Sequence, residues 1–305
     1  MIQRVRPDLL LLNEFDQCWP GIEGLTAFNR DFLGHSQGGA EPIHYEYLHV
    51  APSNTGVPVE GESDLCQGFG QFPGHYGMAL LSRYPLDLPA CRSFRLFPWS
   101  AMPGASRPML EGRPYHEDIL WQKLRLSSKS HWDLAIDIQG KRLRLLASHP
   151  TPPVFDGPER RNAARNFDEI RFWADYLSPE RSQYIRDDQG RGGGLEPGLP
   201  FLVLGDLNAD PAKGESLPGA AAQLLNHPLI DSRFVPSSPG GLALGDAGRT
   251  ADWGLRVDYV LPSRQGLEVK GGGVFWPAPE DPQARLVRGP EASDHRLVWL
   301  DIELL

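Results

Sequence analysis

Residues 201–208, where an apolar run stops at a polar turn, constrain the fold most. Phe-Leu-Val-Leu leads straight into Gly205-Asp206-Leu207-Asn208, a pattern that predicts a buried strand ended by a sharp turn. Asp206 and Asn208 are two residues apart, so in an extended chain they project to the same side. The segment therefore predicts a carboxylate and a carboxamide presented together at the end of a strand.

Three other apolar runs meet polar residues in the same way. Leucines 9–12 lead into Asn13-Glu14, and Ser293-Asp294-His295 introduces the run 297–300. His149 ends a strand candidate at 143–148, before a proline-rich segment. Mg²⁺ prefers oxygen ligands and is commonly held by one or two carboxylates plus a substrate phosphate. Together these strand ends predict one site for a hard divalent cation and a phosphate ester.

Short strands separated by long connections account for much of the remaining chain, which contains 29 Pro and 33 Gly. Further strand candidates are 77–82, 134–138, 256–261 and 269–275, and the run 143–147 pairs with 134–138 as a hairpin across Gln139-Gly140. One helix is clear, because Asp156 and Glu159 resemble a capping box and apolar residues recur from 163 to 177 at helical spacing. A second, shorter helix fits 219–226. The pattern favours one α/β domain in which two packed β-sheets carry helices outside.

Charge and composition narrow the classes of partner. The 305-residue chain has a formal net charge of −9 and no run of more than two basic residues, so nucleic acid stays open as a partner but is not indicated by charge. No apolar run reaches membrane-spanning length, and the N-terminus lacks a signal-peptide pattern. Cys18, Cys66 and Cys91 read as small buried hydrophobes, with one disulfide and one free thiol as the alternative.

Chemistry suggests a role for each polar residue. Asp206 could align or activate a water molecule and Asn208 could donate to a phosphate oxygen, the alternative being a simple Asx turn. His295 could act as a general base or, when protonated, stabilise an anionic transition state. It then needs a partner on its other ring nitrogen, and Asp258 is our prediction. In the alternative, Asp258 pairs with Arg256 on its own strand.

Three more residues have candidate roles. His149 suits a general acid or a phosphate contact, against a purely structural histidine. Arg83 and Lys129 could contact the substrate, although each could equally support its local turn. Loop aromatics such as Trp276 could stack on bases or sugars, but we expect them to anchor the loops.

In order and spacing these motifs resemble the endonuclease/exonuclease/phosphatase superfamily, which has the DNase I-like fold. The resemblance spans nearly the whole chain and rests on six segments: Asn13-Glu14, residues 77–85 (GMALLSRYP), His149, residues 205–209 (GDLNA), residues 256–259 (RVDY) and residues 293–295 (SDH). It implies an α/β four-layer sandwich of two packed mixed β-sheets flanked by helices. It also implies that Glu14, with Asp294 nearby, binds Mg²⁺ or Mn²⁺, that Asp206 orients water and that Asn208 holds phosphate. His295, oriented by Asp258, and His149 would face the phosphate.

One part of the family pattern has no counterpart here, namely a first strand that bears an asparagine. We expect residues 1–305 to be a single domain lacking that strand, through fragmentation, a misplaced start or loss. A secreted or periplasmic origin stays open, and we expect a monomer. The expected activity is metal-dependent hydrolysis of a phosphate ester, as a phosphodiesterase or phosphatase, by in-line attack of water. The alternatives are a metal-dependent nuclease and a non-catalytic binding protein on the same scaffold.

Overall fold

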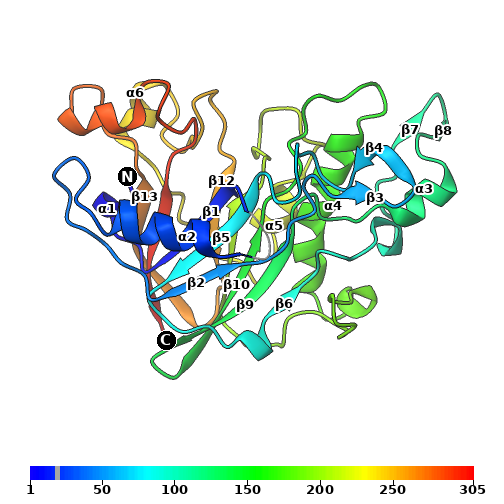
Figure 1. Ribbon diagram of the computed structural model, residues 1–305, viewed down its shortest axis with the longest axis horizontal. Coiled ribbons are helices and arrows are strands. Elements are labelled where there is room, and N and C mark those ends of the chain that lie inside the picture. The colour runs from blue at the N-terminus through cyan, green and yellow to red at the C-terminus, as the bar shows by residue number, and fades with distance from the viewer. Residues whose placement is uncertain (18–20) are drawn as a thin grey trace.

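The computed structural model describes residues 1–17 and 21–305 and shows four layers, helix, sheet, sheet and helix (Figure 1). The central layer is a five-stranded sheet in the order β12-β11-β10-β9-β6. Its strands are β6 (Arg92–Ser93), β9 (His131–Ile138), β10 (Lys141–Ser148), β11 (Phe201–Asp206) and β12 (Asp258–Pro262). Only β10 and β11 run parallel, and the other neighbours are antiparallel.

The second sheet layer has two parts. A three-stranded sheet has the order β1-β5-β2, and β13 pairs with β14 in a separate ribbon. The strands are β1 (Leu9–Phe15), β2 (Tyr47–Val50), β5 (Gly77–Ser82), β13 (Leu267–Val274) and β14 (Val298–Leu304). Leucines of β9, β10 and β11 pack against Met78, Leu80 and Leu267 of this layer, which forms the inter-sheet core.

Helices cover both outer faces. On the five-stranded sheet, α4 (Arg161–Tyr176) buries Ile170, Phe172 and Trp173, while α2 (Glu23–Ala27) and the π-helix η1 (Phe28–Leu33) cover the three-stranded sheet. The remaining helices are α1 (Ile2–Val5), α3 (Asp118–Lys123), α5 (Ala222–Leu225), α6 (Pro239–Ala243) and the 3₁₀ turns η2 (Leu88–Ala90), η3 (Trp99–Ala101), η4 (Ser182–Tyr184) and η5 (Pro282–Val287). Two small hairpins are β3 (Pro58–Val59) with β4 (Glu62–Cys66) and β7 (Met109–Leu110) with β8 (Arg113–Pro114).

The start of the long helix differs from the predicted capping box. Helix α4 begins at Arg161, so Pro158 and Glu159 lie before it, and Arg160 at its N-cap position is left-handed. The Asp156 carboxylate still receives the N–H groups of Asn162 and Ala163, at 2.8 and 2.9 Å. Asp156 therefore still caps the helix, but the N-cap position is Arg160, four residues after Asp156.

Other local predictions can be compared directly. Residues 134–147 form the predicted hairpin, and α5 lies inside the predicted short helix at 219–226. Trp276 is buried and anchors its loop. Cys66 and Cys91 are free and half-buried rather than buried, and Cys18 lies outside the described residues.

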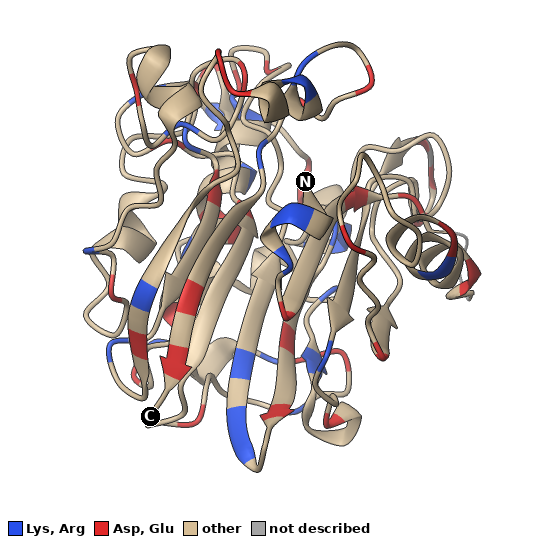
Figure 2. Ribbon diagram, turned by 90° about the vertical axis from the view of Figure 1, so that its left-hand side faces the viewer, with Lys and Arg blue, Asp and Glu red and all other residues tan. Residues whose placement is uncertain are grey.

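A groove of about 590 Å³ runs along two strand edges. Within the described residues, β1 pairs only with β5 and β14 only with β13, so each leaves one edge open, and both line the groove. Figure 2 shows acidic and basic residues interspersed along the strands seen from this side. No helix in the described part of the chain is long and apolar enough to span a membrane.

Gly205 sets how closely β11 approaches β10 beside the predicted site. Its φ is +143°, and a Cβ built there would lie 1.9 Å from the backbone oxygen of Ser148.

We expect Gly205→Ala to lower the free energy of unfolding by on the order of 3 kcal/mol, because backbone must move. Gly140→Ala is the matched control, since Gly140 also has positive φ but open space, and it should cost about 1 kcal/mol. Urea unfolding of both variants measures the difference, and equal losses would contradict this packing argument.

Candidate active site

The polar residues at the strand ends converge on one edge of the fold. Asp206 is the last residue of β11 and pairs in register with Asp258, the first residue of β12. His149 directly follows β10, and His295 lies three residues before β14. Glu14, near the end of β1, lines the same groove as Asp206, Asp258 and His295. Residues that are far apart in sequence are therefore neighbours here.

Asp206 lies between the two histidines. Its Oδ2 is 3.4 Å from Nε2 of His149 and 3.7 Å from Nε2 of His295. The residue is only 4% exposed. Burial acts to raise the pKa of Asp206, but His149, His295 and the backbone N–H of Asn208 outweigh it and hold that pKa below its ordinary value. Asp206 is therefore a carboxylate at neutral pH.

His295 has the predicted partner. Its Nδ1 lies 2.9 Å from Oδ2 and 3.1 Å from Oδ1 of Asp258. The guanidinium of Arg256 instead lies over the ring of Tyr259, so the alternative pairing within the strand does not occur. Burial acts to lower the pKa of His295, but the hydrogen bond and charge of Asp258, together with Asp206, raise it to about 9. The ring is therefore an imidazolium at neutral pH.

His149 differs from His295 in its surroundings. It is 1% exposed, and neither ring nitrogen has a hydrogen-bond partner within the described residues. Burial and the nearby ammonium of Lys129 lower the pKa of His149, even though Asp206 acts to raise it. We therefore take His149 as neutral and His295 as charged, which gives the two histidines different chemistry.

Asn208 occupies the turn after β11. Its backbone N–H donates to Oδ1 of Asp206 at 2.8 Å, and its φ of +51° is left-handed. Its side-chain amide donates to the carbonyl of Pro150 at 3.1 Å. The Asx turn is thus present, and the amide ties the Asp206 turn to the segment after His149. One amide hydrogen remains for a further acceptor.

The side-chain ammonium of Lys129 lies near enough to Asp206 and Glu14 to interact with their charges. The residue is 6% exposed, and no hydrogen bond or ion pair to its ammonium is present among the described residues. Burial lowers the pKa of Lys129, while the charges of Glu169, Asp206 and Glu14 act to raise it. A buried cation without a direct partner is costly. An anionic group bound nearby would remove that cost.

Two carboxylates are free to hold a cation. Glu14 and Asp294 are exposed, line the groove, and make no side-chain hydrogen bond or ion pair within the described residues. Asn13 adds a buried Oδ1 that has no hydrogen-bond partner in residues 1–17 or 21–305. Ligand atoms of Asp206, Asp258 and His295 also lie within 4.8 Å of one another, although Asp258 and His295 are already bonded to each other. Oxygen donors without partners fit a hard divalent cation.

Arg83 is not near these residues. It follows β5 at the end where Ser82 pairs with Leu9, whereas Gly77 at the other end pairs with Phe15. Its guanidinium pairs with Asp8 at 3.2 Å. The strand separates Arg83 from the site, so its predicted substrate contact has no support in the geometry.

Two contributors were missed by sequence reasoning. Glu169 of α4 accepts the N–H groups of Ser128 and Thr151, both at 2.6 Å, and so ties the segments around Lys129 and His149 together. A carboxylate next to the apolar face of α4 was the available signal. Trp253 is half-exposed, and its ring lies edge-on to His295 with centroids 5.0 Å apart. Nothing in the sequence distinguished it from other loop aromatics.

The fold is that of the DNase I-like class of hydrolases. The model of the Endonuclease/Exonuclease/phosphatase family matches residues 1–295. The chain belongs to that family, whose enzymes act on phosphoesters. A search of curated proteins found no match.

Solved structures share the fold at low sequence identity. An endonuclease/exonuclease/phosphatase from Beutenbergia cavernae DSM 12333 matches with a TM-score of 0.55 and 18% identity, over 99% of this chain and 64% of that one. A family protein from Leptotrichia buccalis C-1013-b has a TM-score of 0.51 and 15% identity, over 99% and 90%. The human Nocturnin catalytic domain with bound sulfate has a TM-score of 0.50 and 16% identity, over 100% and 83%. This chain thus spans about two thirds of the first of these proteins.

Proposed function

We propose that the protein hydrolyses a phosphate ester with the help of a divalent cation, as a phosphodiesterase or phosphatase. The observation that carries the proposal is the buried Asp206 carboxylate between a neutral His149 and a charged His295 that Asp258 holds. Hydrolysis of a phosphate ester needs an aligned water and positive charge around the phosphoryl oxygens. At this strand edge Asp206 can align the water, and the His295 imidazolium supplies positive charge.

Asp206 aligns the attacking water. Its depressed pKa makes it a weak base, so it accepts a hydrogen bond from water and orients the oxygen for in-line attack. The remaining amide hydrogen of Asn208 and the ammonium of Lys129 hold non-bridging phosphate oxygens. No covalent enzyme intermediate is needed.

The pKa values separate the roles of the histidines. A raised pKa, to about 9, keeps His295 protonated, so it stabilises the developing negative charge and can give a proton to the leaving oxygen. The lowered pKa of His149 keeps that ring neutral, which suits a hydrogen bond to a phosphate oxygen rather than general-acid work. Of the two roles left open for His149 by its sequence, the phosphate contact is favoured.

Glu14 and Asp294 would hold Mg²⁺ or Mn²⁺. When bound, the cation supplies Lewis-acid stabilisation of the phosphoryl charge. It also helps to attract an anionic substrate, because the protein itself has a net charge of −9. The sulfate bound to the human Nocturnin catalytic domain, a tetrahedral anion like phosphate, supports an anion site on this fold.

Hydrolysis of bis-p-nitrophenyl phosphate and p-nitrophenyl phosphate tests the proposal. We expect release of nitrophenol with Mg²⁺ or Mn²⁺ and its loss in EDTA. Mg²⁺ should also raise Tm, because a ligand that binds only the folded state stabilises it. Glu14→Gln should remove most of that shift, and Glu23→Gln, an exposed glutamate on α2, should not. A folded protein that releases no nitrophenol with either metal would refute the proposal.

A further inference from the structure

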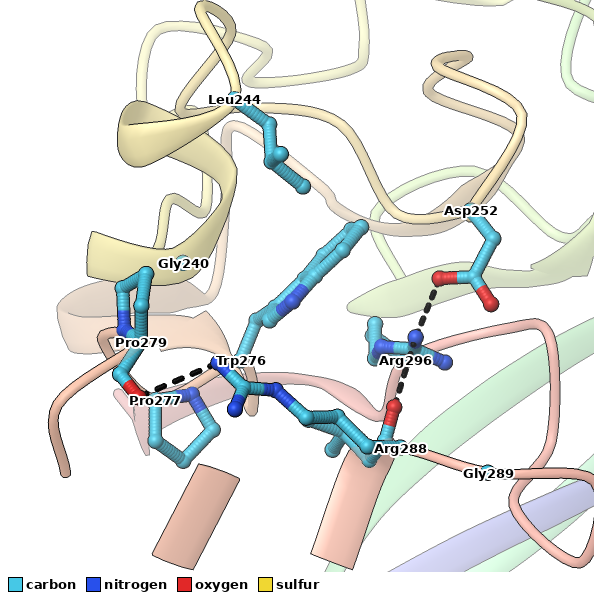
Figure 3. Close-up of a pocket in the computed structure, with 10 residues that line it drawn as sticks. Gly240, Leu244, Asp252, Trp276, Pro277, Pro279, Arg288, Gly289 and Arg296 are labelled. Carbon is cyan, nitrogen blue, oxygen red and sulfur yellow. Dashed lines mark hydrogen bonds and ion pairs between the residues drawn. The ribbon is translucent and has the colours of Figure 1, made fainter. Parts of the chain in front are cut away.

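A second cavity lies behind the segment that carries His295. Its volume is about 350 Å³, at the lower end of the range for small-molecule sites. Apolar walls come from Trp276, Leu244 and Pro279, and the polar lining comes from Arg288, Arg296 and Asp252 (Figure 3). Nothing in the proposed reaction uses this cavity.

The indole of Trp276 is held rigidly in the wall. The guanidinium carbons of Arg296 and Arg249 lie 4.4 and 5.2 Å from its ring. A Cβ on Gly240 would lie 2.2 Å from Cδ1 of Trp276, so only glycine allows this approach. The wall is therefore formed before any ligand arrives, which reduces the entropy cost of binding.

The charge of the lining is opposite to that of the whole protein. Two arginines face one aspartate in the cavity, while the chain carries a net charge of −9. Asp252 is already paired with Arg296. Arg288 is exposed, and among the described residues its guanidinium makes one hydrogen bond, from Nη2 to the carbonyl of Pro279 at 3.1 Å. Nε of Arg296 is buried and has no hydrogen-bond partner in the part of the chain that the structure describes. Cationic donors therefore remain available.

The cavity and the candidate active site share a wall. Arg296 follows His295 in the chain and donates through Nη1 to the carbonyls of Ser293 and His295. The N–H of Asp252 donates to the carbonyl of Asp294 at 2.9 Å, and the adjacent Trp253 packs against the His295 ring. A ligand in the cavity would thus lie next to the segment that presents the charged histidine.

We propose that this cavity binds an anionic group, a phosphate, sulfate or carboxylate, carried on an apolar or planar body. Guanidinium groups match such anions in charge and in the geometry of their paired donors, and the apolar walls suit the attached body. The position of the cavity beside the candidate active site assigns it to a second anionic group of the substrate, beyond the phosphate that reacts. This assignment rests on the proposed function. The same chemistry would accept a free anion as an effector.

Calorimetric titration with inorganic phosphate in metal-free buffer tests the site. Arg288→Gln should weaken binding at the cavity about tenfold, the scale of one charge-assisted hydrogen bond. Arg285→Gln is the matched control: Arg285 is exposed on η5, the turn that directly precedes Arg288, and does not line the cavity, and the substitution removes the same charge. Affinity within twofold of wild type is expected for it. Equal weakening by both variants, or no effect of either, would overturn the proposal.

Kinetics then identify the source of the anion. If the anion belongs to the substrate, Arg288→Gln lowers kcat/KM for a dinucleotide with a terminal phosphate and leaves the dinucleotide without it unchanged. If the anion is free, neither dinucleotide responds to the substitution. Hydrolysis of bis-p-nitrophenyl phosphate tests the proposed function separately. Absence of hydrolysis and absence of phosphate binding in the cavity are therefore distinct results.

Discussion

Asp206→Ala is expected to lower kcat for bis-p-nitrophenyl phosphate by about a thousandfold, within the range measured for loss of a positioned acid–base group. The substitution removes the carboxylate that lies 3.4 Å from His149 and 3.7 Å from His295. Without it, neither the water nor the two rings keep their orientation. The measurement is kcat at saturating Mg²⁺, beside a thermal unfolding curve.

Asp206→Asn tests whether activity is lost because the charge is missing or because the turn after β11 is disturbed. An asparagine oxygen can still accept the N–H of Asn208, so the turn after β11 should survive. The variant should fold with a Tm below that of the wild type, because the folded protein stabilises the Asp206 charge through His149 and His295. Its kcat should nevertheless stay within about tenfold of Asp206→Ala. An active Asp206→Asn protein would show that the carboxylate is not needed.

Asp258→Asn should move the alkaline limit of activity. In the wild type, the pKa of His295 is raised to about 9, so the imidazolium is present below that pH and is lost as pH rises through it. The pKa of Asp258, which burial raises to about 6, sets the acid limit, because below it the carboxyl is protonated and the ion pair is lost. Replacing the charge by an amide should lower the alkaline limit by about two pH units, toward the ordinary pKa of histidine.

Two measurements check this shift. The pH profile of kcat/KM should show the displaced limit, and NMR titration of the His295 ring should report its pKa directly in the metal-free protein. Linkage gives a third consequence. Above about pH 6, where Asp258 is ionised, the stability that His295 gains from its partner is greatest near pH 6.5 and declines as pH approaches 9. An unchanged alkaline limit in Asp258→Asn would mean that another group controls it.

The ends of strands could be predicted from the sequence, because the change from apolar to polar residues marks where a strand ends. Glu14, His149, Asp206 and His295 were placed at such boundaries, and Asp258 was placed within a predicted strand. The fold brings all five to one edge. The contact between His295 and Asp258 was predictable because a charged histidine needs an acceptor and β12 offered a polar residue in an apolar run.

Contacts that depend on tertiary packing were not readable. Arg83 carries a suitable charge next to a strand, but the direction of β5 places it away from the site. The start of α4 was misplaced because Asp156 reaches over several residues to cap it. Glu169 and Trp253 act through neighbours from distant segments, and the local sequence marked only Glu169, as a carboxylate next to the apolar face of α4.

The spread of the site over the chain has a consequence for folding. Glu14 and His295 lie near opposite ends of the sequence span, and the strands between them pair across long separations, a topology that folds slowly. The carboxylate of β1 and the imidazolium before β14 belong to the two separate parts of the second sheet layer, so the site forms only when both parts have assembled. During refolding, recovery of helical circular dichroism should therefore precede recovery of catalysis. A chain interrupted before β14 should show secondary structure without turnover.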